Sequence, residues 1–328
     1  MQNKKINGLL CNGSKEIFSL DETNAMRGLW CLIVVLVHIP AAYQNRLQDM
    51  LGSFAYIGVS FFFMTSGFGL MLGIEKNGFG KMTGFWKRRL PKLLIPMVIM
   101  NLLTMAVTFV ETGKMDWIQL IRITGYVRQL LLFYLVFWSG CQFAYKYITP
   151  AYRKCFLYGE VLILILILYA ASFLLSMPLW PVESVGFLLG MLLAQHRKRV
   201  GGLFERKWML KCVVACVCSA IVGLVYIKIK HIDFIGDYIV RILLNICIQL
   251  FVLCVNNRVS VVTALTRFLG KISYEIYLLH GVVFSFLIML PVDFGSWPFI
   301  ILSLMLTVLL SAVVEGISTR INKYFPKE

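Results

Sequence analysis

Two residues near the start of the chain, Arg27 and His38, are spaced so that they could act together. They are eleven positions apart, and eleven steps of about 100° make three full helical turns plus about 20°, so both share one helix face. At a rise of about 1.5 Å per residue they lie roughly 16 Å apart along the axis. One helix face therefore links Arg27 at the cytoplasmic edge of the membrane to an ionisable histidine beyond the bilayer centre. The alternative is structural, with a snorkelling arginine and a histidine that is hydrogen-bonded between helices.

A basic cluster precedes the third long apolar stretch. The sequence FWKRRLPKLLIP places Lys87, Arg88, Arg89 and Lys92 within six positions. Guanidinium groups suit phosphate oxygens, so the cluster predicts a cytoplasmic clamp for the phosphates of a nucleotide-like ligand. The alternative is a simple anchor that stops the following helix at the membrane surface.

Four polar residues recur at every fourth position of a later apolar stretch: Asp237, Arg241, Asn245 and Gln249. Such a stripe cannot face lipid cheaply. We expect it to line a cavity or to form hydrogen bonds across helices, with Asp237 and Arg241 as a close ion pair.

A second polar face is predicted in the sequence LGKISYEIYLLHG, where Ser273, Tyr277 and His280 stand at positions i, i+4 and i+7. The earlier stretch GVSFFFMTSGFGL is rich in small residues, Ser66 among them, that permit close helix packing. We expect Ser66, Tyr277 and His280, together with Arg241 and Asn245 of the stripe, to line an internal cavity for substrate. For His280 the alternative is a histidine held by packing alone.

The composition indicates which elements position these groups. Of 328 residues 59% are hydrophobic and only 15% are charged, and a mean hydropathy of +0.79 excludes an ordinary soluble protein. A membrane-spanning helix needs about 20 apolar residues. We therefore expect an all-α, polytopic membrane helix bundle of about ten spans, the sixth short and interrupted by glycine. These spans are predicted over 28–45, 54–74, 93–110, 129–148, 157–176, 182–195, 210–229, 234–255, 274–291 and 298–316.

Basic residues indicate the orientation of the bundle. If both termini lie in the cytoplasm, 25 of the 32 Lys and Arg residues fall in cytoplasmic segments, six fall in outer segments, and Arg241 lies inside a span. No apolar run precedes the first span, so we expect no cleavable signal peptide. The predicted organisation is a cytoplasmic tail over 1–27, one membrane domain over 28–316 and a cytoplasmic tail over 317–328.

The net charge of +16 and the nine cysteines need no further function. The positive-inside bias accounts for the charge, and no basic–aromatic module is present, so we expect no nucleic-acid partner. Cys212, Cys216 and Cys218 lack a neighbouring histidine, so we expect membrane packing there rather than a metal site, with metal binding as the alternative.

Taken in order along the chain, these motifs resemble the integral-membrane acyltransferase-3 family of O-acyltransferases, and the resemblance covers nearly the whole chain. The stretches that carry it are RGLWCLIVVLVH, GVSFFFMTSGF, KRRLPKLLIP, ESVGFLLGMLLAQHRK and GKISYEIYLLH.

The resemblance implies a membrane O-acyltransferase that moves an acetyl or other acyl group from cytosolic acyl-CoA to a hydroxyl of a cell-envelope glycan or lipid-linked sugar. It implies a multi-pass protein of the bacterial cytoplasmic membrane, with Arg27 and His38 as the catalytic pair and acetyl-CoA as the acyl donor. Arg27, Arg88, Arg89 and Lys92 are the expected donor-binding residues. The family's Arg-x-x-Arg pattern reads Arg89-Leu-Pro-Lys92 here, with lysine at its second position.

Two other function classes compete with an acyltransferase. In a secondary transporter, His38, Arg241 and the polar stripe would form a proton or solute path, and internal repeats would be expected. A receptor or scaffold would need no pairing of Arg27 with His38. Binding of CoA to the purified protein would separate an acyltransferase from both of these alternatives.

Overall fold

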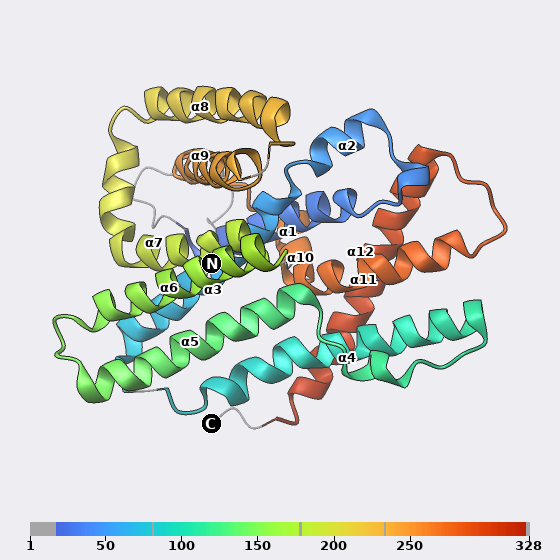
Figure 1. Cartoon of the computed structure of the whole chain (residues 1–328), viewed down its shortest axis with the longest axis horizontal. Helices are drawn as coiled ribbons and strands as arrows, with labels where there is room; N and C mark the ends of the chain where they lie inside the picture. Colours follow the sequence, from blue (N-terminus) through green and yellow to red (C-terminus); the bar gives the residue numbers. More distant parts are fainter. Residues whose placement is uncertain (1–17, 81, 177–178, 233, 326–328) are drawn as a thin grey trace, which may run out of the picture.

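The computed structural model describes residues 18–80, 82–176, 179–232 and 234–325, and these form helices and no strands. Figure 1 shows α8 and α9 together at one corner, α5 and α6 side by side, and α11 crossing α12, which it contacts. The helices are α1 (Leu20–Val37), η1 (Ala41–Tyr43), α2 (Arg46–Gly52), α3 (Ala55–Asn77), α4 (Phe85–Thr112), η2 (Trp117–Ile121), α5 (Gly125–Tyr147), α6 (Arg153–Leu175), α7 (Pro181–Glu205), α8 (Trp208–Ile229), η3 (Ile235–Val240), α9 (Arg241–Asn256), α10 (Ala264–Lys271), α11 (Ser273–Ile288) and α12 (Ser296–Asn322).

Seven helical stretches of the described residues are long and apolar enough to cross a membrane. An eighth is added if α10 and α11, which meet at a bend of 70°, form one span. The all-helical membrane fold is thus confirmed, whereas the count of ten spans and the cytoplasmic position of both termini stay predictions. The two predicted spans outside this set correspond to α1 and α7. Both carry several charged residues, among them Arg27 and Glu183.

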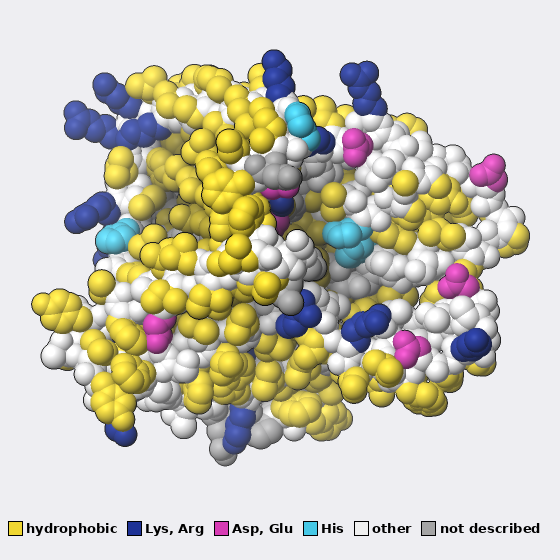
Figure 2. All heavy atoms as spheres, in the orientation of Figure 1, with side chains coloured by type: hydrophobic (Ala, Val, Ile, Leu, Met, Phe, Trp, Pro, Cys, Tyr) yellow, Lys and Arg dark blue, Asp and Glu magenta, His cyan; other side chains and the backbone are white. Residues whose placement is uncertain are grey.

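The surface matches a protein that faces lipid. In α8, the side chains of Val213, Ile221 and Leu224 are 57%, 56% and 65% exposed, which would be costly in water over a whole helix. Figure 2 shows hydrophobic side chains spread over α8 and along α5 and α6, while many Lys and Arg side chains project from the periphery of the molecule.

The first helix lies earlier in the chain than predicted. It begins at Leu20 rather than 28, because Ser19 caps it with a hydrogen bond from the Glu22 amide. It ends at Val37 rather than 45, because Pro40 disfavours helical backbone in the residue before it. His38 is therefore the C-terminal cap of α1 and is exposed, instead of lying inside a span that continues past it. The predicted tail loses its last residues to α1, and residues 1–17 and 326–328 of the two predicted tails lie outside the described residues.

The centre of the bundle is the contact between α3 and α7. A Cβ at Gly186 or Gly190 of α7 would collide with the α3 backbone at Ser60 or Met64, so only glycine lets the two helices approach this closely. Phe61 of α3 and other fully buried aromatic rings of α5 and α7 fill the space around this contact. The close packing predicted for the second apolar stretch is confirmed, whereas the sixth, predicted to be short and interrupted by glycine, is the continuous helix α7 over Pro181–Glu205.

Candidate functional site

A cavity of about 660 Å³ opens between α1, α3, α4, α5, α11 and the end of α12. It joins three of the predicted donor-binding residues, Arg27 from α1 and Arg89 and Lys92 from α4, with the predicted cavity residue Ser66 from α3. Lys323 and Lys271 also line it, and Lys271 pairs there with Glu315 at 3.1 Å. We call this the basic cavity. All five basic residues come from chain segments predicted to face the cytoplasm.

Arg27 reaches the basic cavity with an unmet hydrogen-bonding requirement. Its Nε is buried and has no hydrogen-bond partner, and its guanidinium carbon lies 6.0 Å from the centroid of the Phe62 ring. An unpaired buried donor costs about 1–3 kcal/mol, more when it belongs to a charged group, so this arrangement fits a site completed by an anion. Arg89 is oriented differently: its guanidinium carbon lies 4.5 Å from the Phe85 ring centroid and 5.6 Å from that of Tyr134.

Several lining residues were not predicted from the sequence. Tyr126 and Tyr134 of α5 and Tyr274 of α11 line the basic cavity, and the Tyr274 hydroxyl donates to the Leu93 carbonyl at 2.8 Å. Glu275 is buried and also lines the cavity. It was not predicted as a site residue, although it lies in the same sequence motif as Tyr277. Tyrosines in an apolar stretch give no signal of their own, because they are equally common as packing residues.

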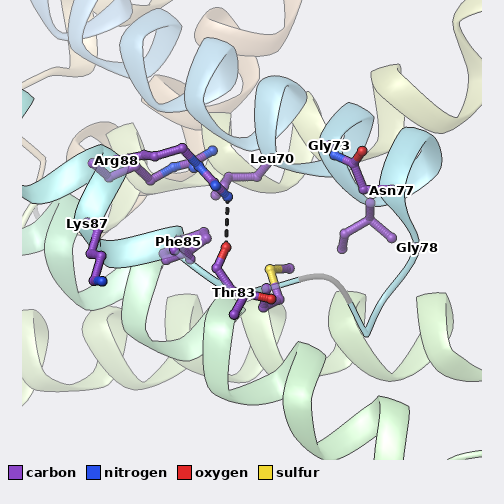
Figure 3. Close-up of a pocket in the computed structure, with 12 residues that line it drawn as sticks. Leu70, Gly73, Asn77, Gly78, Thr83, Phe85, Lys87 and Arg88 are labelled. Carbon is purple, nitrogen blue, oxygen red and sulfur yellow. Dashed lines mark hydrogen bonds between the residues drawn. The ribbon is translucent and has the colours of Figure 1, made fainter. Parts of the chain in front are cut away.

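A second cavity, of about 810 Å³, adjoins the first through Arg89, which lines both. It lies between the end of α3, the loop that follows it and the start of α4 (Figure 3). Arg88 donates from Nη2 to the Thr83 carbonyl at 3.1 Å, and Lys87 points away from this contact in Figure 3. The predicted basic cluster is therefore divided, with Lys92 on the basic cavity and Lys87 and Arg88 on its neighbour.

His38 and His280 meet, with ring centroids 4.7 Å apart. In each ring, Nδ1 lies within hydrogen-bond distance of the carbonyl four residues earlier, 2.9 Å to Val34 for His38 and 3.3 Å to Ile276 for His280. A carbonyl oxygen only accepts, so Nδ1 of each ring carries a hydrogen and Nε2 is the nitrogen left to accept a proton. His38 is exposed whereas His280 is buried, so Nε2 of His38 belongs to the more accessible ring. This arrangement suits a general base.

An aromatic row connects the histidine pair to the basic cavity. The Tyr277 ring centroid lies 6.0 Å from that of His280 and 5.0 Å from that of Tyr126, which lines the cavity. His38 itself does not line the basic cavity. Because α1 is continuous from Arg27 to Val37, the predicted axial separation of roughly 16 Å between Arg27 and His38 holds.

The polar stripe is arranged differently from the prediction. Arg241 pairs with Glu183 of α7 at 2.8 Å instead of with Asp237. Residues Ile235–Val240 form a π-helix, whose wider turn removes the i, i+4 alignment that the predicted pair needs. Asn245, predicted to line the substrate cavity, is fully buried and donates to the Ser60 hydroxyl at 2.7 Å. Gln249 also donates a hydrogen bond to α3, so the C-terminal half of the stripe, Asn245 and Gln249, holds α9 against α3.

Among the described residues no group of three His, Cys, Asp or Glu side chains is placed to hold a metal ion. A family model described as an acyltransferase domain matches residues 20–316. No curated protein and no solved structure shows a significant match to the chain.

Proposed function

Because the chain belongs to the acyltransferase family whose model matches residues 20–316, we propose that it moves an acetyl group from acetyl-CoA to a hydroxyl of a cell-envelope glycan or lipid-linked sugar. Its family and its apolar helices make it a multi-pass membrane acyltransferase. Donor, acceptor and a place in the bacterial cytoplasmic membrane are the parts that we propose.

The observation that carries the proposal is the meeting of Arg27, Arg89 and Lys92 on one cavity, with the buried Nε of Arg27 lacking a partner. CoA carries a diphosphate and a 3′-phosphate, so it needs several cationic groups spread over an extended site. Arg88 and Lys87 on the adjoining cavity provide further charge for the same ligand. The combined space suits a long anionic donor better than a compact one.

The acyl end of the donor is uncharged and can pass deeper into the bundle. We place its path from Arg27 along α1 and past Tyr126 and Tyr277 toward His38. The roughly 16 Å between Arg27 and His38 is about the length of a pantetheine arm.

The histidine pair supplies the chemistry in this proposal. Nε2 of His38 takes the proton of the acceptor hydroxyl as its oxygen attacks the thioester carbonyl carbon. The carbon–sulfur bond then breaks, the ester forms, and the proton passes from His38 to the sulfur of CoA, so that the base is regenerated. In a second version the acetyl group rests on His38 before it moves to the acceptor. His280, adjacent to His38, is a positioning residue in both versions.

Mass spectrometry of envelope glycans from cells with and without the gene tests the function. We expect an acetyl ester on the glycan that disappears with the gene and returns with the wild-type chain but not with His38→Ala. Purified protein with isotopically labelled acetyl-CoA tests the donor, and labelled peptide containing His38 after rapid quenching would identify the acyl-carrier version. Unchanged glycans in the deletion strain, together with no CoA binding by the purified protein, would contradict the proposal.

A further inference from the structure

A third cavity, of about 330 Å³, shares no lining residue with the basic cavity or with the cavity that adjoins it, and it has no part in the proposed donor site. Its size is at the lower end of the range for small-molecule sites, about 300–1,000 Å³. It lies where the ends of α6 and η3 meet the starts of α7 and α9. It is lined by Ser172, Leu179, Trp180, Pro181, Val182, Glu183, Asp237, Tyr238 and Arg241.

At one side of this cavity an ion pair is held in place with one donor unused. Arg241 Nη2 donates to Glu183 Oε1 at 2.8 Å, and Glu183 is buried. The Arg241 guanidinium carbon lies 4.5 Å from the Tyr56 ring centroid, and the Tyr56 hydroxyl donates to the Arg241 carbonyl at 3.2 Å. The Nε of Arg241 is buried and has no partner. A partly buried, oriented guanidinium that lines a cavity is suited to a ligand oxygen.

The opposite side presents aromatic and hydroxyl groups on strained backbone. Trp180 lines the cavity with φ 44° and ψ 51°, a left-handed conformation that is uncommon outside glycine. Phe234, just before the π-helix, has a φ of 64°. The Tyr238 hydroxyl lies 3.2 Å from that of Ser172. Strained residues and π-helical turns occur preferentially at functional sites, where packing holds them against their own preference.

The position of the cavity places it at the end of the bundle that also holds His38. Along α3, Tyr56 supports Arg241 whereas Gly69 lines the basic cavity, and these 13 positions span roughly 20 Å. Gly52, just before α3, lies against Val37, the neighbour of His38. Figure 2 shows acidic and basic side chains at the bottom of a hollow next to α9, the helix that Arg241 begins.

We propose that this cavity is the acceptor subsite and that it binds a neutral or amino sugar ring; this inference rests on the proposed function. Sugar rings stack their C–H faces on aromatic side chains, here Trp180, and share their hydroxyls between carboxylate and guanidinium groups. Glu183 and Asp237 outnumber Arg241 in formal charge. The cavity therefore disfavours an anionic ring such as a uronic acid and accepts an uncharged or protonated one.

Saturation-transfer NMR on the full chain in nanodiscs tests the subsite with three probes: methyl glucoside, methyl glucosaminide and methyl glucuronide. We expect the wild type to bind the first two and to bind the glucuronide at least tenfold more weakly. Asp237→Asn should weaken binding of the glucosaminide severalfold and strengthen binding of the glucuronide. Asp293→Asn, which removes an exposed carboxylate outside the cavity, should change neither.

The aromatic contact has its own comparison. Trp180→Leu should weaken both favoured probes at least tenfold, and Trp180→Phe should restore most of the binding, which a loss of folding would not do. Absence of signal from all three probes would overturn the inference. Equal signals from the wild type, Trp180→Leu and Asp237→Asn would overturn it as well. CoA titration of the same samples separates the two proposals, because failure of CoA to bind contradicts the donor site and leaves the sugar result standing.

Discussion

Replacement of Arg27 by glutamine tests the donor site most directly. The change removes the positive charge and keeps a polar side chain that ends about where Nε of the arginine lies. Because the buried Nε of Arg27 has no hydrogen-bond partner in the described residues, the change breaks no hydrogen bond at that atom and loses only the contact of the guanidinium with the Phe62 ring, whose centroid is 6.0 Å away. The effect on ligand binding is therefore separable from an effect on the fold.

The magnitude follows from the energy of hydrogen bonds to charged groups. Such a bond contributes about 1.5–3 kcal/mol, so loss of one phosphate contact at Arg27 predicts CoA binding weaker by about 10- to 150-fold. Without CoA, the variant should be as stable as the wild type or more stable, because a neutral amide costs less to hold at this partly buried position than a charged guanidinium with an unsatisfied donor. The wild-type affinity should also fall as salt is raised, since added ions screen the basic cavity.

Calorimetric titration of acetyl-CoA into the protein in nanodiscs measures the affinity, and thermal unfolding of the same samples measures the stability. Arg128→Gln is the matched control, because it removes an exposed arginine that lines neither the basic cavity nor the cavity that adjoins it. An Arg27→Gln affinity within twofold of wild type would refute the reasoning. Equal losses in the two variants would do so as well, since they would reflect overall charge rather than this site.

Three further outcomes are expected. His38→Ala should abolish acetyl transfer while CoA binding stays at the wild-type level, and His280→Ala should reduce the rate less; full activity in His38→Ala would exclude it as the base. Cysteines placed at the exposed positions Asp49 and Asp293 should react with membrane-impermeant reagents from outside the cell, and labelling only from the cytoplasm would invert the predicted orientation. Gly190→Ala should lower the free energy of unfolding by about 1–3 kcal/mol, because its methyl group meets the α3 backbone, and an unchanged melting temperature would contradict that packing.

The features that could be predicted from the sequence depend on hydropathy and charge. Long apolar stretches with small residues specify helices and their close contacts, as Gly186 and Gly190 do between α3 and α7. The positive-inside bias predicts that basic residues gather at one end of the bundle, and Arg27 and Arg89 line one cavity although 62 positions separate them.

The remaining features depend on local backbone and on tertiary contacts, which hydropathy does not report. Pro40 ends α1 early and turns His38 into a helix cap. A π-helical turn moves Arg241 to Glu183 and away from Asp237. The contact of His38 with His280 joins residues 242 positions apart, and only the packing of α1 against α11 brings it about.

The separation of the charged groups has a physical reason within the proposed reaction. A phosphate cannot enter the apolar interior without a large cost, so the cationic groups that bind it must stay at one end, as Arg27 and Lys92 do. Only the uncharged acyl arm has to travel further, and the residues of α1 between Arg27 and His38 carry no charge. Ionisable groups occur again at the other end, where His38 and the Arg241 cavity lie. In the proposed reaction, a bundle arranged in this way would let a donor and an acceptor from opposite sides of the membrane react without the charged end of the donor crossing it.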